Sequence, residues 1–220
     1  MRIPGGTGMG WLCRIILASL ASLAWCCASA ATTSHRGNLS QDADVRLIPF
    51  SLNAAAEVSM RTFSYAGGMQ ADGTAIPAGG FDPILEVFDG TGAHIGHSDD
   101  DTTNTVGIDP QTLEALDVLF RDVLPAGSYT VALAQFDNFA VGASLLDGFT
   151  REGEGNFTGV LFGCSNAKFC DFKKANRTEA WALDISVNPV PEPSVFALMV
   201  AGLSAASWFG RGKLKCKFKT

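Results

Sequence analysis

The residues best suited to chemistry lie in one polar loop, GHSDDDTTNT, at residues 96–105. Asp99, Asp100, Asp101 and Asn104 offer the hard oxygen ligands that Ca²⁺ prefers. Three adjacent carboxylates also repel one another unless water or a cation screens their charges. The loop lacks the glycine and the closing carboxylate of an EF-hand. It therefore predicts either a calcium site of another type or a solvated acidic loop.

Other side chains of the ligand type lie outside this run of aspartates. Asp82 or Asp137 could complete a calcium site if the fold brings either of them close to the loop. His94 and His97 could form a metal cluster with Asp99. A spacing of three in a strand places two side chains on opposite faces, however, so the pattern favours ordinary surface histidines.

The remaining composition argues against several classes of function. The sequence has no serine elbow, no HExxH motif and no glycine-rich phosphate loop, so nothing in it points to an enzyme. Residues 31–190 contain 21 Asp and Glu against nine Lys and Arg, a net charge of −12. That charge argues against nucleic acid as a partner and favours cations or neutral polymers such as polysaccharide.

Four phenylalanines in the second half of the body could form a glycan-binding surface if they are exposed: Phe136, Phe139, Phe149 and Phe157. Phenylalanine cannot form hydrogen bonds at its rim, which is a disadvantage in sugar binding. Packing in the core is therefore the favoured role for these rings.

The elements that must position these residues are short segments in which apolar and polar residues alternate, a pattern typical of half-buried strands. Strands are predicted within VRLIPFSL, EVSMRTFSY, PILEVFD, SYTVALAQFD and WALDISV. DGTG after PILEVFD predicts a hairpin turn, and PQTLEALDVLFRDVL predicts a short helical turn that leads into a strand. Seven or more such strands predict an all-β fold, an antiparallel, jelly-roll-like β-sandwich over residues 45–188 after a flexible leader at residues 31–44.

Residues 1–30 have the organisation of a secretory signal peptide, with arginines before a short apolar core and small residues at the end. We expect cleavage after Ala30. The bulky Trp25 disfavours the alternative, a lipoprotein signal ending at Cys26 or Cys27.

Cys164 and Cys170 are the two cysteines of the predicted exported body, six positions apart. An exported pair at this spacing predicts a disulfide that closes a small loop. The alternative, a two-cysteine metal site, lacks nearby histidines.

The C-terminal segment, residues 189–220, has three parts in order: Pro191-Glu192-Pro193, an apolar run at residues 195–210, and a basic tail with Arg211, Lys213 and Lys215. This order resembles the PEP-CTERM sorting signal of exported proteins in Gram-negative bacteria that produce exopolysaccharide. The resemblance implies cleavage near the motif by an exosortase-type membrane enzyme.

The apolar run predicts a single transmembrane helix. As a helix it would span about 24 Å, less than the roughly 30 Å of a bilayer core, so we expect Arg211 and Lys213 to snorkel to the interface. The positive-inside rule places this tail in the cytoplasm.

The body is similar to the bacterial pre-peptidase C-terminal β-sandwich family. The similarity rests on FSLNAAAEVSMRTFSY, GGFDPILEVFDGTGAHIGHSDDD and LPAGSYTVALAQFDNF, within about residues 48–140. It implies a non-catalytic accessory module, and calcium binding in the wider group gives some support to a site at Asp99–Asp101.

These features together predict an exported, non-enzymatic protein of the cell surface or extracellular matrix, held at the inner membrane before processing. Its expected partners are the exosortase-type enzyme, the membrane and matrix exopolysaccharide, with no role for nucleic acid. The alternative is a calcium-dependent carbohydrate-binding module.

Overall fold

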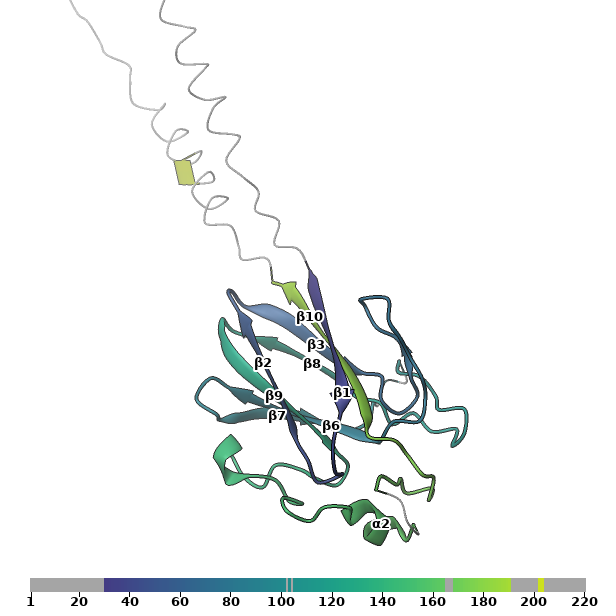
Figure 1. Ribbon diagram of the computed structural model, residues 1–220. Coiled ribbons are helices and arrows are strands. Elements are labelled where there is room, and N and C mark those ends of the chain that lie inside the picture. The colour runs from purple at the N-terminus through teal and green to yellow at the C-terminus, as the bar shows by residue number, and fades with distance from the viewer. Residues whose placement is uncertain (1–29, 102, 104, 165–167, 191–201, 204–220) are drawn as a thin grey trace, which may run out of the picture.

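Two four-stranded antiparallel sheets face each other in the computed structural model (Figure 1), which describes residues 30–101, 103, 105–164, 168–190 and 202–203. The first sheet has the order β1-β10-β3-β8, with β1 at Ala31–Asn38, β10 at Ala180–Pro189, β3 at Ala56–Thr62 and β8 at Leu119–Leu124. The second has the order β2-β9-β6-β7, with β2 at Arg46–Leu52, β9 at Gly127–Gln135, β6 at Pro83–Asp89 and β7 at His94–Ser98. The predicted all-β sandwich is confirmed.

Alternate residues of the strands point into the space between the sheets, as the period of two requires. Val58 and Met60 of β3 and Val131 and Leu133 of β9 are fully buried there. Leu183 of β10 joins the same core. Burial of these apolar faces against each other is what holds the two layers together.

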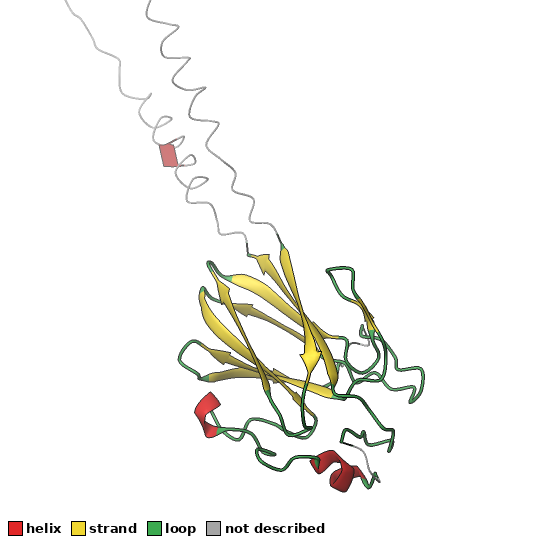
Figure 2. Ribbon diagram, viewed as in Figure 1, coloured by secondary structure: helices red, strands yellow, loops and turns green. Residues whose placement is uncertain are grey.

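The predicted strands form close to their expected bounds. The predicted DGTG hairpin also forms: β6 pairs with β7, and the amide of Gly92 donates to the carbonyl of Asp89 at the turn between them. The helical turn predicted before β8 is reduced to one turn at residues 110–112, which is closed by a bond from the amide of Leu113 to the carbonyl of Asp109. A segment without regular structure leads from it into β8. A short hairpin of β4 (Gly68–Met69) and β5 (Ala75–Ile76) lies outside the two sheets (Figure 2).

The flexible leader predicted at residues 31–44 is wrong. Residues 31–38 form β1, which pairs with β10 along its whole length. Asp42 is fully buried, and its carboxylate accepts hydrogen bonds from the amides of Phe157 and Thr158. The polar composition of this stretch fits an edge strand, of which six residues are exposed.

The outer face of the second sheet is partly covered by the chain between β9 and β10. This covering segment contains a 3₁₀ turn, η1 (Leu145–Asp147), and one short helix, α2 (Phe157–Phe162). Cys164 and Cys170 follow α2 and form the predicted disulfide. Figure 1 places α2 at the end of the sandwich opposite to the start of β1 and the end of β10.

The two predicted sorting segments lie almost entirely outside the described residues, including Pro191, Glu192, Pro193, Arg211, Lys213 and Lys215. In the part of the chain that the structure describes, no helix has the length and apolar character needed to cross a membrane.

Candidate metal centre

Three carboxylates meet where the β6–β7 hairpin opens. Asp82 directly precedes β6, and Asp99 and Asp100 directly follow β7. Because the two strands are antiparallel, with Leu85 opposite Ser98, the start of β6 and the end of β7 lie side by side. One oxygen from each of the three carboxylates lies within 4.8 Å of the others.

Among the described residues, no positively charged side chain is paired with these carboxylates. None of the ion pairs among the described residues involves Asp82, Asp99 or Asp100. Asp82 is only 5% exposed. Within the described residues, its Oδ1 atom and the Oδ1 atom of Asp99 are buried without a hydrogen-bond partner. Buried polar atoms are normally paired, so these two oxygens are available to a ligand.

Burial and mutual repulsion both disfavour the charged forms. Burial raises the pKa of Asp82 well above its usual range, and the charges of Asp100 and Asp99 raise it further. Burial, followed by the charge of Asp100, raises the pKa of Asp99 to about 7. Burial and the charge of Glu114 also raise the pKa of Asp100. A bound divalent cation would relieve this repulsion and satisfy the unpaired oxygens.

The structure separates Asp101 from this acidic cluster of Asp82, Asp99 and Asp100. Both oxygens of Asp101 accept hydrogen bonds within its own loop, from Thr103, Thr105 and Val106. Burial alone would raise the pKa of Asp101, but the bonds from Thr103 and Thr105 outweigh it and hold this pKa well below the usual range. The carboxylate of Asp101 therefore stabilises its own turn. This finding corrects the prediction that Asp101 is a calcium ligand.

The other two candidates for the calcium site have different outcomes. Asn104 lies outside the described residues. Asp137 lies near enough for its charge to raise the pKa of Asp99, but its own carboxylate forms an ion pair with Arg151. Of the two residues proposed to complete the site, it is Asp82 that joins the cluster.

The predicted placement of the two histidines on opposite faces is wrong. In the β6–β7 ladder Val87 pairs with Gly96, whereas Phe88 pairs with His94, so Ile95 is an extra residue in β7. This β-bulge shifts the alternation by one, and it turns His94 to the same face as His97. Their ring centroids lie 6.3 Å apart.

Sequence reasoning missed Glu86, which lies on the same outer face between the acidic cluster and the bulge. Its Oε2 atom lies 2.6 Å from Nε2 of His94, and its side chain is 4% exposed. Glu86 is the one charged residue inside the apolar run PILEVF. A carboxylate in such a strand is the signal that could have identified it.

The four phenylalanines pack against other side chains, but they lie outside the core cluster between the two sheets, where packing was predicted. Phe157 is buried, and Phe136, Phe139 and Phe149 are half-buried. Phe136 contacts Phe139 edge-on, and Phe149 contacts Phe88 in the same manner. They form no exposed aromatic platform.

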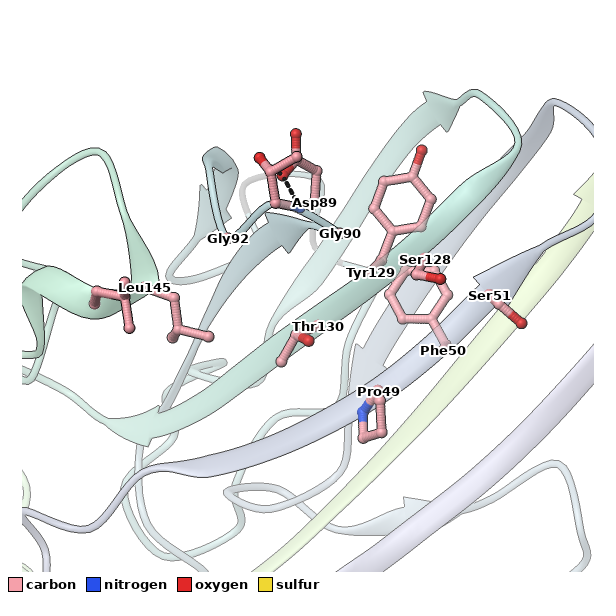
Figure 3. Close-up of a pocket in the computed structure, with 12 residues that line it drawn as sticks. Pro49, Phe50, Ser51, Asp89, Gly90, Gly92, Ser128, Tyr129, Thr130 and Leu145 are labelled. Atoms are coloured by element: carbon pink, nitrogen blue, oxygen red, sulfur yellow. Dashed lines mark hydrogen bonds between the residues drawn. The ribbon is translucent and has the colours of Figure 1, made fainter.

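A shallow depression of about 590 Å³ lies on the outer face of the second sheet, near the hairpin turn after β6. Figure 3 shows the side chains of Ser51, Ser128 and Thr130 along this face, from the neighbouring strands β2 and β9. The ring of Tyr129 stacks on that of Phe50 at 5.2 Å. The depression is lined by these hydroxyl groups together with the apolar side chains of Pro49, Leu145 and Leu146. It lies at the other end of β6 from Asp82.

Comparison with known proteins finds no matching family model and no similar curated protein. The resemblances to the PEP-CTERM signal and to the pre-peptidase C-terminal family therefore stay predictions that rest on the motifs themselves.

Proposed function

We propose that this chain is an exported, non-enzymatic protein of the cell surface or extracellular matrix whose β-sandwich binds Ca²⁺ at Asp82, Asp99 and Asp100. The acidic body, the signal-like N-terminus and the PEP-type C-terminus support export and sorting. The site geometry supports the calcium function, because its three ligands are carboxylates, the hard oxygen donors that Ca²⁺ prefers.

The observation that carries the calcium proposal is the buried carboxylate of Asp82. A solvated acidic loop would leave its carboxylates in water, where each can be hydrated. Asp82 is instead buried beside two further carboxylates, with one oxygen unpaired among the described residues. Such an arrangement is costly without a cation and becomes favourable with one.

The test is calorimetric titration of the purified chain with Ca²⁺. We expect one ion to bind with a dissociation constant at or below about 1 mM. Asp82→Asn should weaken binding at least about tenfold, because it removes the charge of a ligand. It should also stabilise the calcium-free protein by about 1–3 kcal/mol at pH 8, because an unpaired buried charge is lost.

The matched control is Asp122→Asn, which removes an exposed carboxylate on β8. It should leave both the affinity and the free energy of unfolding unchanged. Equal calcium binding by the wild type and Asp82→Asn would contradict the site.

The sorting proposal rests on Pro191-Glu192-Pro193, the predicted transmembrane helix and the basic tail. Intact mass of the protein recovered from its native envelope tests it. We expect a chain that begins at Ala31, ends near the Pro-Glu-Pro motif and contains the Cys164–Cys170 disulfide. In cells without the processing enzyme the C-terminal segment should remain, and an unchanged mass would contradict sorting.

The depression near the hairpin turn, where hydroxyl groups lie beside apolar side chains, favours a second function, binding of matrix polysaccharide. It lies roughly 20 Å from Asp82, because the length of β6 separates them. Calcium at the acidic cluster would therefore not coordinate a sugar in the depression. Titration with exopolysaccharide, with and without Ca²⁺, tests this alternative, and heat that appears only with Ca²⁺ would contradict independent sites.

A further inference from the structure

Three potential metal ligands converge on the outer face of the β6–β7 hairpin, separate from the acidic cluster. They are Glu86 of β6 and His94 and His97 of β7, and one ligand atom from each lies within 4.8 Å of the others. His97 stands directly opposite Glu86 in the ladder, and His94 stands opposite Phe88. Glu86 and Phe88 occupy alternate positions of β6, so both histidines share the face of Glu86.

The carboxylate at the centre of this group is fixed from two sides. Its Oε1 atom accepts a hydrogen bond of 3.2 Å from the amide of Ala140, in the segment that covers the sheet. Its Oε2 atom lies 2.6 Å from Nε2 of His94. The ring of His94 packs against Phe88, with centroids 5.2 Å apart. Glu86 and His94 are thus already held in place by their neighbours. Metal ligands in proteins are usually oriented in this way.

A simple hydrogen bond between His94 and Glu86 accounts for only part of this arrangement. Such a bond needs only His94. It does not explain why the ring of His97 lies nearly parallel to that of His94, with 22° between their planes. The bulge at Ile95 interrupts the ladder and brings His94 to the face that Glu86 and His97 already share. His97 is exposed, so the group opens to solvent on that side.

We infer that Glu86, His94 and His97 form a binding site for a divalent transition-metal ion of the zinc class. Imidazole ligands favour Zn²⁺, Cu²⁺ and Ni²⁺, whereas Ca²⁺ takes oxygen ligands. Two histidines and one carboxylate supply three protein ligands, which leaves a coordination position for water or an external ligand. This inference does not depend on the calcium proposal, because the two sites share no ligand.

The test uses the full chain without a tag, solubilised in detergent and freed of metal. Serine replaces the four cysteines outside the disulfide, so that free thiolates do not compete for the ion: Cys13, Cys26, Cys27 and Cys216. Zn²⁺ is titrated by calorimetry, and Co²⁺ is titrated by its visible absorption. We expect one ion per chain, with nitrogen and oxygen ligation of Co²⁺.

His94→Ala and His97→Ala should each weaken Zn²⁺ binding at least about tenfold, since even partners outside the ligand shell change affinity by that much. His35→Ala is the matched control, because it removes the remaining histidine, on β1 in the other sheet. It should bind Zn²⁺ as the unsubstituted chain does. Asp82→Asn should also leave the Zn²⁺ affinity unchanged while it weakens Ca²⁺ binding.

His97 is exposed on an edge strand, so His97→Ala decides the question even if His94→Ala fails to fold, as circular dichroism would show. Unchanged Zn²⁺ binding by His97→Ala would overturn the site. Loss of Zn²⁺ binding in Asp82→Asn instead would assign the ion to the acidic cluster and would equally overturn it.

Discussion

Protons and calcium ions compete for the same carboxylates at the acidic cluster. The pKa of Asp99 is raised to about 7, and that of Asp82 is raised too, chiefly by burial in both cases. An acid whose pKa is higher in the folded than in the unfolded state binds more protons when folded. Its stabilising effect is therefore present at low pH and is lost as the pH rises through the folded pKa.

We accordingly predict that the calcium-free protein loses stability between pH 5 and pH 8. Carboxylates with lowered pKa values have the opposite effect, since they make the protein more stable as the pH rises, but only below about pH 4. They are Asp72, Asp89, Asp101 and Asp109. The measurement is the urea midpoint at both pH values in a calcium chelator. Saturating Ca²⁺ should reduce the loss, because the bound ion keeps the carboxylates charged.

Asp99→Asn separates the titration of Asp99 from that of other carboxyls with a raised pKa, such as Asp117, whose pKa is raised by burial. The variant should lose less stability from pH 5 to pH 8 than the wild type. An equal loss in both proteins would contradict the titration of Asp99 in this window.

At the scale of elements, the segment between β1 and β2 is a structural clamp rather than a leader. The carboxylate of Asp42 accepts hydrogen bonds from the amides of Phe157 and Thr158 and from the hydroxyl of Thr158. That hydroxyl in turn accepts a bond from the amide of Cys170. One buried carboxylate thus ties the entry of β2 to α2 and to the disulfide loop.

Asp42→Ala should lower the free energy of unfolding by about 2–4 kcal/mol, because it leaves buried donors without an acceptor. Urea unfolding measures the loss. Asp42→Asn should recover part of it, since the amide oxygen still accepts, and Glu57→Ala at an exposed position of β3 should change little. A loss in Asp42→Ala no larger than that in Glu57→Ala would mean that the clamp contributes nothing.

The differences between the predicted and the observed structure also arise at the scale of elements. Alternation predicted the strands around the core, because burial on one face of a sheet imposes the period of two. It could not predict the bulge at Ile95, since one extra residue leaves no mark in the pattern. The roles of Asp99 and Asp101 likewise differ only through the turn that directs one toward Asp82 and the other into its own loop.

At the scale of the whole molecule, the chain enters and leaves the β-sandwich at one end, and the acidic cluster lies at the other. Ala31 pairs with Val187, so the chain enters β1 and leaves β10 at the same end (Figure 1). Gly80, two residues before Asp82, bridges to Thr178 just before β10 begins. The acidic cluster therefore lies at the opposite end, about 30 Å away along β10.

An anchor in residues 189–220 would thus hold the acidic cluster away from the membrane surface. We predict that membrane vesicles carrying the unprocessed chain bind Ca²⁺ when they are right-side-out and lose this binding when they are inverted. The relevant quantity is the binding by wild-type vesicles in excess of that by vesicles carrying Asp82→Asn, because lipid headgroups also bind the ion.

Asp122→Asn vesicles should bind as the wild type does, because this carboxylate is exposed on β8 and lies outside the cluster. The affinity of the anchored chain should also match that of the processed protein within about twofold, since roughly 30 Å of sandwich separates the ion from the bilayer, several Debye lengths at physiological salt. Excess binding in inverted vesicles would contradict export of the body. A large difference between anchored and processed protein would contradict the placement of the site at the far end.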